Sequence, residues 1–176
     1  MGRLKHRTAP GCTYFVTTKA WRSRELFQLS ENAGIVIQCL LGYREKGTYR
    51  LHEFVVTPNH LHLLLTPADH ISLERAMQLI RGGSSHEIHG QREHKLQIWH
   101  PGFHESTIRN AEDYEERRNY VRMNPVNPRF VGSPGDWLFG SASGRFSLDD
   151  HPSFLSSGAK APSNAGLFVG AKAPTP

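Results

Sequence analysis

The stretch that decides the fold reads YRLHEFVVT over residues 49–57, PN at residues 58–59 and HLHLLLT over residues 60–66. Both long runs are rich in β-branched, aromatic and other apolar residues, which is typical of strands. Only Pro58 and Asn59 separate them, and two turn-forming residues are enough for a tight hairpin. The sequence therefore predicts two adjacent antiparallel strands, Tyr49 to Thr57 and His60 to Thr66.

The segments around this hairpin supply the other elements. A strand is predicted from Tyr14 to Thr18, a β-branched and aromatic run that follows Pro10-Gly11. A helix is predicted from about Glu31 to Tyr43, with apolar residues at three- and four-residue spacing and capping chemistry at Ser30. A second helix is expected to begin at Ser72 and to be broken by Gly82-Gly83.

Beyond Gly83 the pattern is weaker. The polar, histidine-rich stretch from Ser84 to Lys95 is interpreted as a short helix and a loop. The fourth strand is either Leu96 to Trp99 or His104 to Ile108. The last helix begins at Asn110 or Asp113 and ends near Met123, because Pro125 and Pro128 follow. From Gly132 onward the sequence is typical of loops.

The element order strand, helix, strand, strand, helix, strand, helix indicates an α+β fold. We expect a ferredoxin-like (RRM-like) antiparallel sheet with helices on one face, followed by an extra C-terminal helix that carries Tyr120. Residues 1–150 are assigned to this single domain. Residues 151–176 contain the segment GAKAP twice and few residues that a core would bury, so we predict a disordered tail.

Composition narrows the class of protein. Of 176 residues, 38% are hydrophobic and 21% are charged, which is typical of a soluble globular domain. Apolar runs such as Leu63 to Leu65 fall far short of the roughly 20 residues that a membrane span needs, and no apolar segment follows the basic N-terminus. We expect a cytoplasmic protein with no membrane contact, in which Cys12 and Cys39 stay reduced.

The charge balance favours a polyanionic partner. The net charge is +5 and the sequence pI is about 9.5, with the basic residues dispersed along the chain. The candidate contacts with such a partner are Arg22, Arg24, Arg117, Arg118 and Arg122. For the three arginines near Tyr120, solvated charges on a helix surface are the alternative interpretation.

His60 and His62 are the candidate metal ligands. Side chains along a strand alternate between its faces, so both imidazoles point to one side and Leu61 and Leu63 to the other. We expect the two imidazoles on an open face, where they suit one divalent ion. The alternative interpretation is that two histidines alternate by chance on a half-exposed strand, because the chain has eleven histidines. We interpret His86, His89, His94, His100 and His104 as loop residues and not as a zinc site, which would need four convergent ligands.

Tyr120 and Asn124 form a second candidate cluster. They are four residues apart and share one helix face, so a phenol and an amide oxygen would lie side by side. The alternative is a tyrosine packed on the sheet and an asparagine at a helix end. A phenol in this position could attack a phosphorus atom. Tyr114 is the competing candidate for that nucleophile, but its neighbours in the sequence are acidic, which is unfavourable beside a phosphate, whereas those of Tyr120 include arginines.

Several motifs together resemble a known family. The segment PNHLHLLL at residues 58–65 is similar to the histidine–hydrophobic–histidine signature of single-tyrosine HUH transposases. The segments WHPGFH at 99–104, IRN at 108–110 and YVRMNPV at 120–126 resemble the branch called REP-associated tyrosine transposases, where REP denotes a repetitive extragenic palindrome. The resemblance runs in motif order from about Tyr14 to Phe146. Thr57 departs from it, since relatives often have methionine there.

This resemblance implies a sequence- and hairpin-dependent single-strand DNA endonuclease and strand transferase. Tyr120 would form a 5′-phosphotyrosine intermediate, and His60, His62 and Asn124 would hold a divalent cation, Mg²⁺ or Mn²⁺, of which Mn²⁺ suits imidazole better. The implied partners are single-stranded DNA hairpins of repetitive extragenic palindromes, in a bacterial, nucleoid-associated setting. We expect a monomer, with a dimer as the alternative.

Two rival functions stay open at this point. The first is a catalytically silent DNA-hairpin-binding protein of the same fold, which would not need the full set His60, His62, Tyr120 and Asn124. The second is an RNA-binding protein, which would present exposed aromatic residues on its central strands for base stacking. The strand from His60 to Thr66 instead offers His60, His62 and Leu64 on that face.

Overall fold

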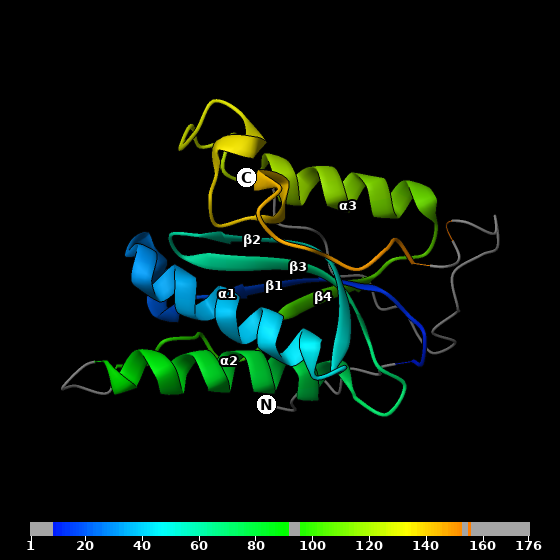
Figure 1. Cartoon of the computed structure of the whole chain (residues 1–176), viewed down its shortest axis with the longest axis horizontal. Helices are drawn as coiled ribbons and strands as arrows, with labels where there is room; N and C mark the ends of the chain where they lie inside the picture. The colour runs from blue at the N-terminus through cyan, green and yellow to red at the C-terminus, as the bar shows by residue number, and fades with distance from the viewer. Residues whose placement is uncertain (1–8, 92–95, 153–154, 156–176) are drawn as a thin grey trace.

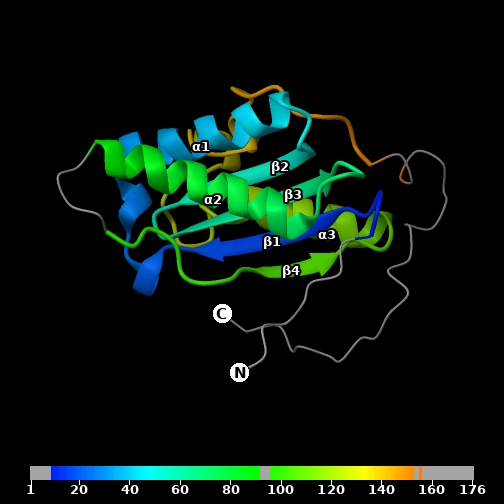
Figure 2. The same ribbon diagram turned by 90° about the horizontal axis from the view of Figure 1, so that it is seen from below.

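A computed structural model describes residues 9–91, 96–152 and 155 of the chain. Within these residues four strands form one antiparallel sheet in the order β2-β3-β1-β4 (Figure 2). The strands are β1 (Tyr14–Lys19), β2 (Tyr49–Thr57), β3 (His60–Pro67) and β4 (His104–Thr107). The two central strands are therefore β3, with the imidazole pair, and β1.

Three α-helices enclose the sheet from both sides. Helices α1 (Ser30–Glu45) and α2 (Leu73–Gly90) lie together on one face, and α3 (Ala111–Met123) crosses the opposite face (Figure 1). Short 3₁₀ turns complete the described chain: η1 (Trp21–Ser23), η2 (Leu26–Gln28), η3 (Pro134–Asp136) and η4 (Ser141–Ser143). The predicted α+β class, the ferredoxin-like strand order and the extra helix are confirmed.

The predicted break of α2 at Gly82-Gly83 is wrong. The helix continues to Gly90, and its continuation buries Ser84 and Ile88. A Cβ on Gly83 would lie 3.1 Å from the Tyr43 ring of α1, so glycine permits a close helix–helix approach at this point. The packing that this approach allows outweighs the modest helix propensity that two glycines forfeit.

Other boundaries needed smaller corrections. Of the two predicted fourth strands, the second is present as β4, whereas Trp99 makes only an isolated bridge to Ala20. Asn110 caps α3, accepting a 2.8 Å hydrogen bond from the Asp113 amide, and the helix ends at Met123 as predicted. Ser30 does not cap α1 through its side chain, because Leu29 is the N-cap residue.

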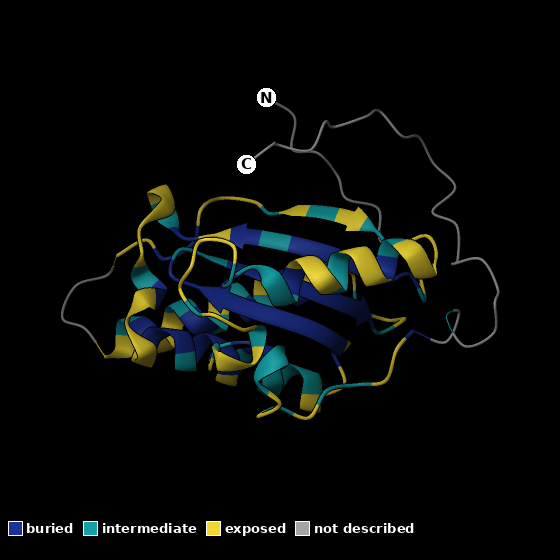
Figure 3. Cartoon of the chain, turned by 90° about the horizontal axis from the view of Figure 1, so that it is seen from above, coloured by how far each residue is buried: buried dark blue, intermediate teal, exposed yellow. Residues whose placement is uncertain are grey.

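The sheet is covered on both faces, and the alternation of β3 places apolar residues on each of them. Leu61, Leu63 and Leu65 belong to the main core beneath α1 and α2. Leu64 belongs to a second cluster with Phe15, under the buried residues of α3. The expected open face is therefore covered: Figure 3 shows α3 lying over strands that are almost wholly buried, with exposed residues along its outer surface.

The segment after α3 covers the outer edge of β2. Gly140 forms a bridge with Val55, and the Phe139 carbonyl accepts a hydrogen bond from the Val56 amide. Further along, the Asp149 carboxylate accepts a 2.7 Å bond from the Leu51 amide. This region is thus packed, not only loop-like, and it leaves less of the edge of β2 unpaired. The predicted tail with its repeated segment lies mostly outside the described residues, and none of the described helices is long and apolar enough to cross a membrane.

Candidate active site

The two imidazoles of β3 lie beneath α3. His60 pairs in register with Lys19 of β1, and His62 pairs with Thr17. Their ring centroids are 4.5 Å apart at an interplanar angle of 79°. His60 is half-buried and sits at the start of the strand, whereas His62 is only 3% exposed. The period-two alternation therefore places both rings on one face, side by side, as predicted.

His62 is held in a fixed orientation with one nitrogen left unpaired. Its Nδ1 forms a 2.8 Å hydrogen bond with the Thr17 hydroxyl, and its ring stacks on Phe15 at 5.5 Å. Its Nε2 is buried, and within the described part of the chain it has no hydrogen-bond partner. When Nδ1–H donates to the hydroxyl, Nε2 carries a free lone pair. Burial, followed by the charges of His60 and Lys19, lowers the pKa of His62 well below its usual value, which favours this neutral form.

His60 faces the end of α3. Its Nε2 lies 3.2 Å from the Oδ1 of Asn124, the C-cap residue of that helix, and its Nδ1 contacts Asn59 at 2.5 Å. Burial lowers the pKa of His60, the hydrogen bond to Asn124 raises it, and Lys19 lowers it, with a lowered pKa as the result. The lowered pKa favours the neutral imidazole, which is the form that can bind a cation.

Tyr120 presents a reachable phenol beside this pair. Its ring centroid lies 5.2 Å from that of His62 and 5.7 Å from that of Phe15, edge to face in both cases. The side chain is 42% exposed, so a substrate can approach it from solvent. Tyr114, the competing nucleophile, is fully buried and bonded through its hydroxyl to His151 at 3.0 Å. Of the two tyrosines, only Tyr120 combines exposure with proximity to the imidazoles.

The donor atoms present suit one divalent cation. A separation of 3.2 Å between His60 Nε2 and Asn124 Oδ1 is close to the roughly 3 Å between adjacent ligands of an octahedral ion with bonds of about 2.1 Å. The unpaired His62 Nε2 is the kind of buried lone pair that a metal ion satisfies. No group of three or more His, Cys, Asp or Glu side chains in the described ranges converges as a metal site, so a ligand set would include the amide.

The five predicted arginine contacts divide into two groups. Arg22 and Arg24 are exposed in the loop after β1, where the Arg22 guanidinium lies 5.6 Å from the Trp21 ring centre. Arg117 lies 5.2 Å above the Phe15 ring at the site. Arg118 and Arg122 instead form ion pairs with a buried carboxylate of β2.

The histidines interpreted as loop residues are mostly in regular structure. His86 and His89 lie in α2, and His104 is the first residue of β4. His100 does lie in a loop, where its ring packs 5.9 Å from that of Trp21. His94 falls outside the described residues. The extension of α2 through its glycines accounts for the first two differences.

Sequence reasoning missed three residues of β1 that border the site. Thr17 binds His62, Phe15 packs against His62 and Tyr120, and Lys19 lies opposite His60. A signal was present, because these residues alternate along one strand and so share one face. What the sequence lacked was the pairing of β1 with β3, which brings that face beside the imidazoles.

Comparisons with known proteins identify the family and the fold. The chain is 26% identical over 140 residues to a REP-associated tyrosine transposase of Escherichia coli (strain K12), across 79% of this chain and 81% of that protein. Its fold is similar to that of a REP-associated tyrosine transposase solved bound to a REP hairpin, with a TM-score of 0.67, 21% identity and coverage of 99% and 100% of the two chains. Residues 11–124 match the family described as "Transposase IS200 like". The chain therefore belongs to the IS200-like transposase family.

Proposed function

We propose that this protein is a single-strand DNA endonuclease and strand transferase that acts beside hairpins of repetitive extragenic palindromes through a phosphotyrosine on Tyr120. Membership of a transposase family supports the reaction class, and the relatives named above support the hairpin substrate. The observation that carries the proposal is an exposed phenol 5.2 Å, centroid to centroid, from an imidazole with an unpaired buried nitrogen.

In the proposed reaction the Tyr120 hydroxyl attacks the scissile phosphorus and loses its proton to water. A bond forms between the phenolic oxygen and phosphorus, the bond to the 3′ oxygen breaks, and that oxygen leaves as a hydroxyl after taking up a proton. The covalent link preserves the energy of the phosphodiester, so a 3′-hydroxyl of the same or another strand can displace the tyrosine. Strand transfer then needs no nucleotide cofactor.

His60, His62 and Asn124 are the proposed ligands of a divalent cation, Mg²⁺ or Mn²⁺. When bound, it supplies polarisation of the scissile phosphate and offsets the charge that develops there. The protein's own contribution is orientation: Thr17 fixes the His62 ring, and the C-cap position of α3 fixes Asn124 beside His60. The phenol of Tyr120 is then held on the same side as these donors.

DNA binding is proposed to rest on three arginines. Arg22 and Arg24 are exposed after β1, and the half-buried Arg117 lies over Phe15 at the site, in a chain of net charge +5. The site contains β1, β3 and α3 of one chain, so a monomer suffices for the proposed reaction. A setting at the bacterial nucleoid belongs to the same proposal.

A covalent-capture experiment tests the function. A single-stranded hairpin oligonucleotide labelled at its 3′ end is incubated with protein and Mn²⁺, and adducts are resolved on a denaturing gel. We expect an adduct with the wild type and with Tyr114→Phe, and none with Tyr120→Phe, with His62→Ala or after chelation of the metal. An adduct that persists in Tyr120→Phe contradicts the assignment, and hairpin binding without any adduct identifies a silent binding protein instead.

A further inference from the structure

A buried carboxylate on β2 faces the helix that carries Tyr120. The pairing of β2 with β3 shifts register between Leu51 and Glu53, which is the signature of a β-bulge. Leu51 and Phe54 remain in the core beneath α1 and α2, whereas His52 and Glu53 both turn toward α3. The bulge thus delivers to the α3 face a glutamate that simple alternation would not place beside His52.

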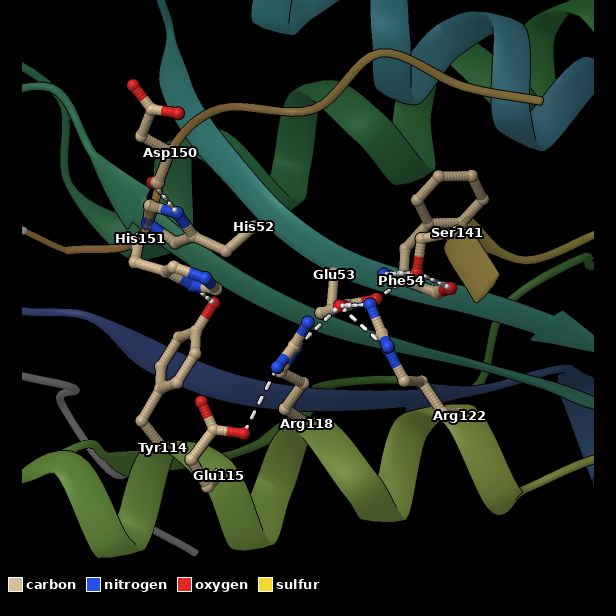
Figure 4. Close-up of polar contacts among 10 residues, drawn as sticks. All are labelled: His52, Glu53, Phe54, Tyr114, Glu115, Arg118, Arg122, Ser141, Asp150 and His151. Atoms are coloured by element: carbon tan, nitrogen blue, oxygen red, sulfur yellow. Dashed lines mark hydrogen bonds and ion pairs between the residues drawn. The ribbon is translucent and has the colours of Figure 1, made fainter. Parts of the chain in front are cut away.

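Glu53 is 3% exposed and binds three side chains from two other segments (Figure 4). Its Oε1 accepts hydrogen bonds from Arg118 Nε at 3.1 Å and from Arg122 at 2.9 Å for Nε and 2.7 Å for Nη2. Its Oε2 accepts a hydrogen bond from the Ser141 hydroxyl of η4. A buried carboxylate shared by two guanidinium groups is anchored from several sides.

These contacts hold α3 where apolar packing is sparse. The residues of α3 that are buried are Tyr114 and Val121, so most of the helix is not fixed by a core. Arg118 and Arg122 are one turn apart on the flank toward β2 and bracket Tyr120 in the sequence. The ion pairs therefore act on the same two turns of helix that present Tyr120 and, at the end, Asn124.

We propose that Glu53 is a positioning residue that fixes α3 through Arg118 and Arg122, so that Tyr120 and Asn124 stay beside His62 and His60. This inference rests on the proposed function for its catalytic consequence. It also assigns the two arginines to the internal ion pairs and not to DNA. A misplacement of about 1 Å at a reacting group is enough to lower a rate by about 100-fold, so a small tilt of α3 matters.

The test compares Glu53→Gln with Glu115→Gln. Both changes remove one carboxylate that binds Arg118, but Glu115 is 59% exposed and lies on α3 itself, so its loss leaves the helix docked. Single-turnover adduct formation on the labelled hairpin, the dissociation constant for a hairpin and hydrogen exchange of α3 amides are measured for each. We expect Glu53→Gln to slow adduct formation by roughly 10- to 100-fold, with hairpin affinity unchanged and faster exchange confined mainly to α3.

A milder substitution keeps the inference testable if Glu53→Gln does not fold. Arg122→Gln leaves Glu53 paired with Arg118, and the Arg122 side chain is 38% exposed, so the protein should remain folded. We expect a smaller loss of rate with unchanged hairpin affinity and an unchanged salt dependence of binding. Weaker binding with a reduced salt dependence would identify Arg122 as a DNA contact and overturn the inference.

The remaining outcomes separate the inference from the proposed function. If the wild type forms an adduct and Glu53→Gln forms it at the same rate, the positioning role is wrong while the function stands. Unchanged exchange in α3 also overturns the inference, because the helix would then be fixed by other contacts. If the wild type forms no adduct, the proposed function fails, and the exchange of α3 amides in Glu53→Gln then tests by itself whether Glu53 fixes the helix.

Discussion

Replacing Thr17 by valine should weaken metal binding without disturbing the fold. Valine has the shape of threonine and suits a strand, but it lacks the hydroxyl that bonds His62 Nδ1 at 2.8 Å. That bond anchors the His62 ring, because Nε2 has no hydrogen-bond partner among the described residues. Without it, the imidazole can place its proton on Nε2, and that tautomer cannot bind a cation through Nε2.

The size of the effect follows from the loss of one ligand-orienting bond. Loss of a hydrogen bond that orients a metal-bound imidazole typically lowers metal affinity by about 10- to 100-fold. A factor of ten corresponds to about 1.4 kcal/mol, so the expected change in binding free energy is roughly 1.4 to 2.8 kcal/mol. Calorimetric titration of Mn²⁺ measures it, in a Tyr120→Phe background with the hairpin bound so that no reaction occurs.

The adjacent residue provides a matched control. Thr18 is buried on the opposite face, and its hydroxyl has no hydrogen-bond partner among the described residues. Thr18→Val makes the same chemical change one position along β1 and should leave Mn²⁺ affinity unaltered. Equal affinities for the wild type and Thr17→Val, or an equal loss in both variants, would refute the proposed role of His62 as an oriented ligand.

Three further predictions concern the free energy of unfolding, measured by urea titration. Burial lowers the pKa of His52 to about 4, so below about pH 6.5 the unfolded chain binds a proton that the folded protein does not. Between pH 7.5 and 4.5 the wild type should lose about 2.5 kcal/mol more than His52→Gln, and parallel pH profiles would contradict this. Gly82→Ala should stabilise the protein by about 0.5 to 1 kcal/mol, because no atom lies near the Cβ that it adds. Gly83→Ala should stabilise it less, because its Cβ would lie 3.1 Å from the Tyr43 ring. Equal gains in stability for the two variants would refute this explanation of α2. Leu64→Ala should cost about 2 to 5 kcal/mol, and a cost under 1 kcal/mol would show that the α3 face is loosely packed.

The parts of the fold that sequence predicted correctly depend on local pattern. The hairpin of β2 and β3 follows from two apolar runs and a two-residue turn, and the common face of His60 and His62 follows from alternation. Tyr120 and Asn124 are four residues apart, about one helix turn, and they lie beside His62 and His60 respectively. None of these inferences needs knowledge of any distant contact.

The parts that were missed depend on tertiary contacts. The continuation of α2 requires Gly83 to meet Tyr43 of another helix. The ion pairs of Arg118 and Arg122 require Glu53, which is 65 and 69 residues away in the chain and which a bulge rotates toward them. A charged residue on a helix has the same sequence signature whether it faces solvent or a buried partner, so these arginines looked like DNA contacts.

The burial of the candidate site also separates it from an RNA-binding sheet of the same topology. Such a sheet needs its aromatic residues free to stack on bases, and here Phe15 of β1 is packed between His62, Tyr120 and the Arg117 guanidinium. The cost of covering this face is a histidine nitrogen removed from water with no partner among the described residues. An apolar side chain at this position would avoid that cost, and Leu64, two residues later on the same face, is such a side chain. An imidazole at His62 is favourable there if a ligand binds its lone pair and so compensates the lost hydration. The donor atoms around His62 and the reachable phenol of Tyr120 suit a divalent cation as that ligand.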